Sequence, residues 1–109
     1  MAHAQKQAHD PVLAFIRQRL EAAYGARLES VLLFGSRARG DARPDSDYDV
    51  AVFLTHLDNP QLEADRLADI GWKALRDMGQ VVSLKAFPAE ARQRETLILE
   101  TIRNEGVPV

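Results

Sequence analysis

Short apolar runs of strand length constrain the fold of this chain more than any other feature. Residues 31–34 form a continuous apolar run that stops at Gly35, and residues 50–54 form a second run directly after Asp49. Runs without alternating polar positions are typical of strands that are buried on both faces. Residues 81–87 are predicted as a third strand. Residues 107–109 are predicted as a short edge strand, where a proline is tolerated.

Predicted helices separate these strands. The first covers residues 11–24, the second residues 60–78 and the third residues 88–105. An aspartate–proline or asparagine–proline pair opens each of the first two, and a glycine follows each of the three, in agreement with helix-capping preferences. The alternation of helix and strand indicates an α/β domain in which helices flank a small mixed sheet.

The sequence predicts specific packing for two neighbouring residues of the second predicted helix. Gly71 costs about 1 kcal/mol inside a helix, so it is expected to permit close packing against the sheet. Trp72 is expected in the core, with contact to a partner as the alternative.

Length and charge limit the class of protein. The chain has 109 residues, which favours one domain over residues 1–109, with residues 1–9 as a flexible tail. The absence of cysteine excludes a disulfide framework, a thiol nucleophile and a thiolate zinc site. The formal net charge of -2 gives no general attraction for nucleic acid, so direct binding of nucleic acid is not expected.

Hydropathy and size lead to expectations about location and assembly. No apolar run approaches the roughly 18 residues of a membrane helix, so no membrane contact is expected. The N-terminus lacks the apolar segment of a signal peptide, so a cytoplasmic location is expected. Small domains leave much apolar surface near solvent, which keeps a homo-oligomer possible.

The segment between the first two strands is the most informative. Gly35 ends the first strand, and glycine adopts backbone angles that other residues resist. If Ser36 begins a short helix, the first N–H groups of that helix point outward together and form a site for phosphate. The Ser36 hydroxyl adds a donor, and Arg37 or Arg39 adds a planar guanidinium suited to phosphate oxygens.

Asp47 and Asp49 stand at the start of the second strand. Because one residue separates them, both side chains project from the same face. Neighbouring carboxylates repel each other unless a cation lies between them, and Mg²⁺ binds one or two carboxylates together with phosphate oxygens. This pair is predicted to hold Mg²⁺ and to carry catalysis by positioning a nucleoside triphosphate.

Each half of this segment also has an ordinary structural explanation. A glycine–serine turn is common, paired aspartates can be solvated charge at the end of a strand, and the arginines can form surface ion pairs of little energy. The combination favours nucleotide binding, because a short loop joins the two buried strands and brings both ends together.

The segment resembles the signature of the DNA polymerase β–like nucleotidyltransferase superfamily, which is Gly-Ser, ten intervening residues and Asp-x-Asp. Here the ten are residues 37–46. Residues 35–40, Gly-Ser-Arg-Ala-Arg-Gly, and residues 46–50, Ser-Asp-Tyr-Asp-Val, are more closely similar to the minimal nucleotidyltransferase (MNT) antitoxins of bacteria and archaea. The ending at residues 102–107, Ile-Arg-Asn-Glu-Gly-Val, is also similar, so the resemblance covers nearly the whole chain.

The resemblance implies a two-layer nucleotidyltransferase fold with defined site residues. It implies that Gly35 and Ser36 contact the phosphates and that Asp47 and Asp49 bind the metals. The candidate nucleotide-binding residues are Gly35, Ser36, Arg37, Arg39 and Ser46.

The resemblance also implies a partner and a reaction. Members often act as antitoxins for a separate helical partner, the HEPN-domain ribonuclease toxin, and some transfer AMP from ATP to a tyrosine of that toxin. We therefore expect a magnesium-dependent transfer of AMP from ATP to a hydroxyl of such a partner. A resemblance to aminoglycoside nucleotidyltransferases leaves small-molecule modification as an alternative, which would need a partner subunit to complete the site.

One departure from the superfamily pattern concerns catalysis. Active members usually add a third carboxylate from a neighbouring strand, but residues 80–87 contain no Asp or Glu, and Ser83 stands where the acid is expected. General-base help is worth about 10²–10⁴-fold. Its loss favours the alternative of a weak or inactive nucleotide-binding module that neutralises its partner by complex formation. Lys85 shares the face of Ser83 and either approaches one of the two aspartates or points to solvent.

Overall fold

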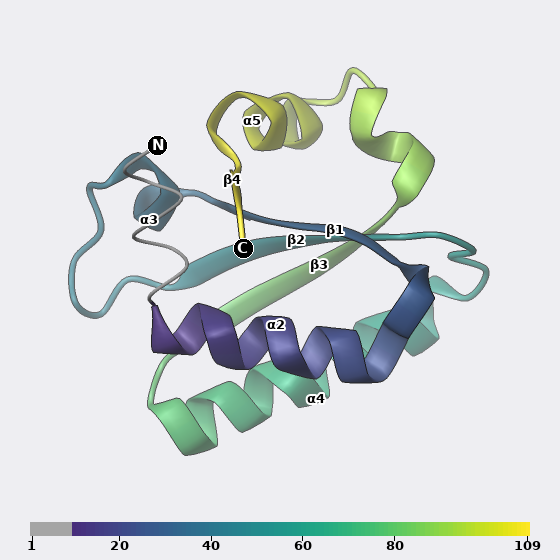
Figure 1. Cartoon of the computed structure of the whole chain (residues 1–109). Coiled ribbons are helices and arrows are strands. Elements are labelled where there is room, and N and C mark those ends of the chain that lie inside the picture. The colour runs from purple at the N-terminus through teal and green to yellow at the C-terminus, as the bar shows by residue number, and fades with distance from the viewer. Residues whose placement is uncertain (1–9) are drawn as a thin grey trace.

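The computed structural model describes residues 10–109 as a four-stranded sheet flanked by helices (Figure 1). The strand order is β3-β2-β1-β4; β2 and β3 are parallel, whereas β1 is antiparallel to both β2 and β4. The mixed α/β sheet confirms the predicted fold class. The expected tail, residues 1–9, lies outside the described residues. The elements are α2 (Pro11–Tyr24), η1 (Gly25–Arg27), β1 (Leu28–Phe34), α3 (Ser36–Arg39), β2 (Tyr48–Leu54), α4 (Pro60–Met78), β3 (Val82–Pro88), η2 (Ala89–Gln93), α5 (Leu97–Glu105) and β4 (Val107–Pro108).

Strand β2 contributes to a core on each face of the sheet. Helices α2 and α4 cover one face, and η2 and α5 lie on the other (Figure 1). Alternate residues of a strand point to opposite faces. Val50 and Val52 therefore pack with α2 and α4, whereas Ala51 and Phe53 pack with Leu99 of α5. Burial on both faces explains why residues 50–54 are apolar without interruption.

The two proline-led helices begin where the sequence predicts. The Asp10 carboxylate accepts hydrogen bonds from the N–H groups of Val12 at 2.8 Å and Leu13 at 3.3 Å. The Asn59 side chain accepts one from Leu62 N–H at 3.1 Å. Such caps satisfy N–H groups that a helix leaves without a partner in its first turn. Both predicted helices are confirmed.

The third predicted helix, residues 88–105, is wrong in its first half. Pro88 still belongs to β3, residues 89–93 form the short 3₁₀ helix η2, and α5 begins only at Leu97. The Thr96 hydroxyl accepts a hydrogen bond from Leu99 N–H at 3.4 Å. Threonine favours such a cap over a position inside a helix, so the helix restarts here instead of continuing from Pro88.

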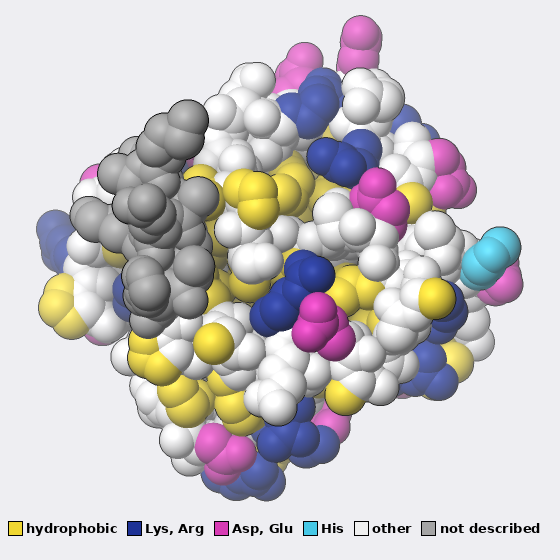
Figure 2. All heavy atoms as spheres, in the orientation of Figure 1, with side chains coloured by type: hydrophobic (Ala, Val, Ile, Leu, Met, Phe, Trp, Pro, Cys, Tyr) yellow, Lys and Arg dark blue, Asp and Glu magenta, His cyan; other side chains and the backbone are white. Residues whose placement is uncertain are grey.

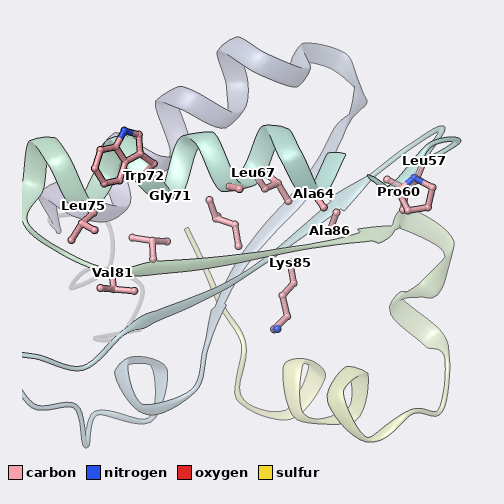
Figure 3. Close-up of a pocket in the computed structure, with 13 residues that line it drawn as sticks. Leu57, Pro60, Ala64, Leu67, Gly71, Trp72, Leu75, Val81, Lys85 and Ala86 are labelled. Atoms are coloured by element: carbon pink, nitrogen blue, oxygen red, sulfur yellow. The ribbon is translucent and has the colours of Figure 1, made fainter. Parts of the chain in front are cut away.

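A groove of about 550 Å³ is lined by residues of α4 and of the edge strand β3 (Figure 3). At Gly71 an added Cβ would lie 3.0 Å from the carbonyl oxygen of Val82, which confirms that glycine permits the close packing of α4 on the sheet. Trp72 borders the groove and is 58% exposed, so its predicted core position is wrong. The buried stripe of α4 includes Ile70 and Ala74. Trp72 is two residues from each of them, which turns its side chain to the opposite side of the helix.

Glu63 of α4 is a charged side chain in the interior, only 3% exposed. It accepts hydrogen bonds from the guanidinium groups of Arg27 at 2.7 Å and Arg66 at 3.4 Å. Burial favours the neutral acid, but the bond and charge of Arg27, with the charge of Arg66, hold the pKa of Glu63 below its usual value. This ion pair connects the end of η1 to α4.

The surface carries charges of both signs. Figure 2 shows basic and acidic side chains interspersed on the face that is turned to the viewer. Within residues 10–109, no helix combines the length and the apolar character needed to cross a membrane.

Candidate active site

Gly35 and Asp49 meet where β1 ends. Phe34 is paired with Asp49 in the antiparallel register of β1 and β2, so Gly35 directly follows the paired position. Gly35 has φ 78° and ψ -158°, a conformation almost restricted to glycine. A Cβ atom at Gly35 would collide with the Asp49 carboxylate. The glycine therefore leaves the space that this carboxylate occupies, and the structure brings the glycine–serine turn and Asp49 together.

The two aspartates have different surroundings. Asp47 lies just before β2 and is exposed, whereas Asp49 is half-buried. Burial and then the negative charge of Asp47 raise the pKa of Asp49 above its usual value, although the positive charges of Lys85 and Arg39 oppose the rise. A raised carboxylate pKa means that the surroundings do not fully compensate the negative charge. The pair would gain from a cation.

The donor set suits a hard divalent cation that arrives with a nucleotide. Carboxylate oxygens are ligands that Mg²⁺ prefers, and Mg²⁺ usually adds waters and substrate phosphate oxygens to one or two protein carboxylates. In the part of the chain that the structure describes, no group of three or more His, Cys, Asp or Glu side chains is placed to hold a metal ion. Asp47 and Asp49 fit a metal ion whose remaining ligands come from water and phosphate.

Helix α3 is the short helix that the sequence predicts after Gly35. It begins at Ser36 and ends at Arg39, and it is capped by Gly40, whose φ is 85°. N–H groups in the first turn of a helix have no partner within it, and here they belong to Ser36 and Arg37. Arg39 is exposed and makes ion pairs with Asp41 at 3.4 Å and Glu105 at 3.3 Å. Exposed pairs of this kind are weak, so they do not prevent Arg39 from reaching a phosphate.

Arg37 is bound to the loop that follows α3. Its guanidinium donates hydrogen bonds to the carbonyl oxygens of Ser46 at 3.0 Å, Pro44 at 3.2 Å and Arg43 at 3.4 Å. The same group lies 4.0 Å from the centre of the Tyr48 ring. A planar guanidinium can stack on an aromatic ring while its N–H groups donate in the ring plane. These contacts fix the loop in front of the paired aspartates; nucleotide contact by Arg37 stays a prediction.

Ser46 and Tyr48 hold the chain on either side of Asp47. The Ser46 hydroxyl accepts a hydrogen bond from Arg43 N–H at 2.8 Å, which closes the turn before Asp47. The Tyr48 hydroxyl donates to Asp10 at 2.8 Å. Burial and the bond to Asp10 raise the pKa of Tyr48 to about 12, so this donor stays protonated at neutral pH. In the structure both side chains position the strand start.

Glu105 is a site residue that the sequence reasoning did not identify. Its carboxylate accepts a hydrogen bond from Gly35 N–H at 2.7 Å and another from Arg39 at 3.3 Å. Because Glu105 uses the Gly35 amide, the amides of Ser36 and Arg37 are the ones that remain for a phosphate. The only signal in the sequence was the position of Glu105 in the ending that resembles the MNT group.

Strand β3 brings two polar side chains to the face of the paired aspartates. Ser83 is paired with Asp49 in the parallel register, and Lys85 is paired with Ala51. Figure 3 shows the Lys85 side chain pointing away from the α4 groove, to the opposite side of the sheet. Lys85 is exposed, and its charge lowers the pKa of Asp49. Among the described residues Lys85 forms no ion pair within 4 Å, so the predicted approach to an aspartate is not seen, and Lys85 is open to solvent as in the other alternative.

A family model named for the nucleotidyltransferase domain matches residues 13–108. The match includes both the glycine–serine turn and the paired aspartates. This chain belongs to the nucleotidyltransferase domain family. None of the curated proteins compared with the chain matches it significantly.

Several solved structures share the fold. One is a toxin–antitoxin with AMP-PNP, with a TM-score of 0.64 and 23% identity over 87% of this chain and 69% of that chain. The MntA-HepT toxin–antitoxin gives a TM-score of 0.53 and 19% identity over 87% of this chain and 68% of that chain. A tri-AMPylated Shewanella oneidensis HEPN toxin in complex with MNT antitoxin gives 0.56 and 19% identity over 96% of this chain and 70% of that chain. These similarities establish the fold.

Proposed function

We propose that this chain transfers AMP from ATP to a hydroxyl group of a helical HEPN-type toxin and thereby acts as an antitoxin. The observation that carries the proposal is the contact between Gly35 and the Asp49 carboxylate, with Asp47 beside it. Membership of the nucleotidyltransferase domain family supports the reaction class. The toxin–antitoxin structures with the same fold, one of them with an AMPylated toxin, support the acceptor.

In the proposed reaction, the acceptor hydroxyl oxygen forms a bond to the α-phosphorus of ATP. The bond from that phosphorus to the bridging oxygen breaks, pyrophosphate leaves with the oxygen, and the hydroxyl proton passes to solvent. Mg²⁺ held by Asp47 and Asp49 would neutralise phosphate charge and stabilise the charge that develops on the transferred group. Ser36 would donate its hydroxyl and N–H to phosphate oxygens, and Arg39 would add a positive charge.

A second function is favoured by the residue beside Asp49. Ser83 lies there in the register of β2 and β3, and β3 has no carboxylate to accept the hydroxyl proton. A missing general base slows transfer by about 10²–10⁴-fold and leaves nucleotide binding possible. The second candidate is therefore a nucleotide-binding module that neutralises its partner by forming a complex.

Label transfer separates the two functions. The chain is mixed with its HEPN-type partner, Mg²⁺ and ATP labelled at the α-phosphate, and label on the partner is measured. We expect transfer by the natural chain and no detectable transfer by the double variant Asp47→Asn, Asp49→Asn. The matched control Asp65→Asn, Asp69→Asn changes two aspartates of α4 and should transfer normally.

The outcomes have distinct meanings. Transfer by the Asp47→Asn, Asp49→Asn variant would show that the chemistry lies elsewhere in the complex. A stable complex without label from the natural chain would favour the neutralising module.

A further inference from the structure

Asp49 and Lys85 lie on the same face of β2 and β3, opposite α4, and Asp47 lies just before β2. Asp49 is paired with Ser83, and Lys85 is the next residue of β3 on the same face. The Lys85 side chain leaves the sheet on the side opposite α4 (Figure 3), and its charge acts on Asp49.

Within residues 10–109, the carboxylates at this face that are free of other bonds are the two aspartates, which suits one divalent ion. Asp47 and Asp49 are the two carboxylates of the pair, and Glu105 is already bonded to Gly35 N–H and Arg39. Among residues 10–109, no third acid or histidine joins the two aspartates in a metal-binding group. A second ion would have no protein carboxylate of its own, although a bound triphosphate would still carry more negative charge than one divalent ion neutralises.

We propose that this site takes a single divalent ion on Asp47 and Asp49, and that Lys85 supplies the second positive charge to the bound triphosphate. The proposal rests on the proposed nucleotide-binding function. A lysine ammonium has three donors on a flexible four-carbon chain, so from β3 it can approach phosphate oxygens held at the paired aspartates. The Lys85 side chain is exposed, so it is free to turn toward a bound phosphate.

The number of bound ions tests the first half of the proposal. The full chain is titrated with Mn²⁺ in the presence of α,β-methylene-ATP, and bound Mn²⁺ is counted from the loss of the free-ion signal in electron paramagnetic resonance. We expect one bound Mn²⁺ per bound nucleotide for the natural chain and for Ser83→Ala. The variant Ser83→Asp restores an acid beside Asp49 and should bind a second ion. Two ions on the natural chain would overturn the proposal.

Nucleotide affinity tests the second half. Lys85→Met should weaken binding of the Mn²⁺ complex of α,β-methylene-ATP by about tenfold, the loss of one charge-assisted contact, measured by isothermal titration calorimetry. The matched control is Lys73→Met, because Lys73 lies on α4 and pairs with Asp69 at 2.9 Å. Unchanged affinity in Lys85→Met would overturn the role of Lys85.

These results are distinguishable from failure of the proposed function. If the natural chain binds no nucleotide analogue at all, the proposed function fails and this inference fails with it. If the analogue binds together with two ions, or binds independently of Lys85, only the inference fails.

Discussion

Glu63 and Asp49 are both acids withdrawn from solvent, yet their pKa values shift in opposite directions. Arg27 and Arg66 donate directly to Glu63, and the pKa of Glu63 is lowered. Burial, and then the second acid beside it, raise the pKa of Asp49. The fold itself compensates the charge of Glu63, whereas the charge of Asp49 is left for something that binds. Such perturbed, uncompensated groups mark functional sites more often than structural ones.

Glu63→Gln should have the largest effect on folding stability, because it removes the carboxylate whose charge Arg27 and Arg66 compensate. We expect the free energy of unfolding to fall by about 2–4 kcal/mol. This loss is slightly smaller than the loss on breaking a fully buried ion pair, because Arg27 and Arg66 are partly exposed. Urea denaturation at neutral pH measures the loss. Glu100→Gln, an exposed change on α5, is the control and should be nearly neutral.

The same variant has a defined dependence on pH. Because the pKa of Glu63 is lowered by folding, its contribution is present above the pKa of an unfolded glutamate and is lost as pH falls through the folded-state value. The stability gap between the natural chain and Glu63→Gln should therefore narrow in acid. A gap that stays constant would show that the ion pair is not the cause.

Gly35→Ala should come next, because it pushes a methyl group against the uncompensated carboxylate. We expect a loss of about 2–3 kcal/mol in unfolding free energy and weaker nucleotide binding, from the glycine-restricted backbone and the collision with Asp49. Gly40→Ala is the matched control: its φ is also positive, but an added Cβ meets nothing within 4 Å. It should cost about 1 kcal/mol and leave nucleotide affinity unchanged. Equal losses in the two variants would contradict a specific clash.

Asp49→Asn should have the smallest effect on stability, and it should stabilise the fold whereas the other two variants destabilise it. In EDTA at pH 7, the amide removes a charge that the fold does not compensate, so the melting temperature should rise slightly. Because the pKa of Asp49 is raised by folding, the folded chain holds this proton more tightly than the unfolded chain. As pH falls from the folded-state pKa of Asp49 to its lower unfolded-state pKa, the natural chain therefore gains stability. The stability advantage of Asp49→Asn disappears over the same pH range. A lower melting temperature of Asp49→Asn than of the natural chain at pH 7 would contradict the claim that the fold leaves the charge of Asp49 uncompensated.

Features that depend on local chemistry could be predicted from the sequence. The caps at Asp10 and Asn59 and the both-face burial of residues 50–54 follow from short-range preferences, and so does the helix start at Ser36. The closeness of Gly35 and Asp49 was also accessible, because only a short loop joins their strands.

Features that depend on distant contacts could not be predicted. The bond from Gly35 N–H to Glu105 joins residues far apart in the chain, and no local pattern specifies it. No local pattern distinguishes Glu63 from an exposed helical acid, because its partner Arg27 is brought to it by the packing of η1. The face of Trp72 depended on which side of α4 meets the sheet, and neighbouring apolar residues left that ambiguous.

The way Arg37 holds its loop has a consequence for how this segment can change in evolution. Its partners at positions 43, 44 and 46 are main-chain carbonyl oxygens, which every amino acid carries, proline included. Replacing the side chains at positions 43 and 44 would leave those acceptors in place, whereas adding or deleting one residue would move them out of register with the guanidinium. Positions 43 and 44 of the loop are thus tolerant of substitution, whereas the loop is intolerant of a change in length.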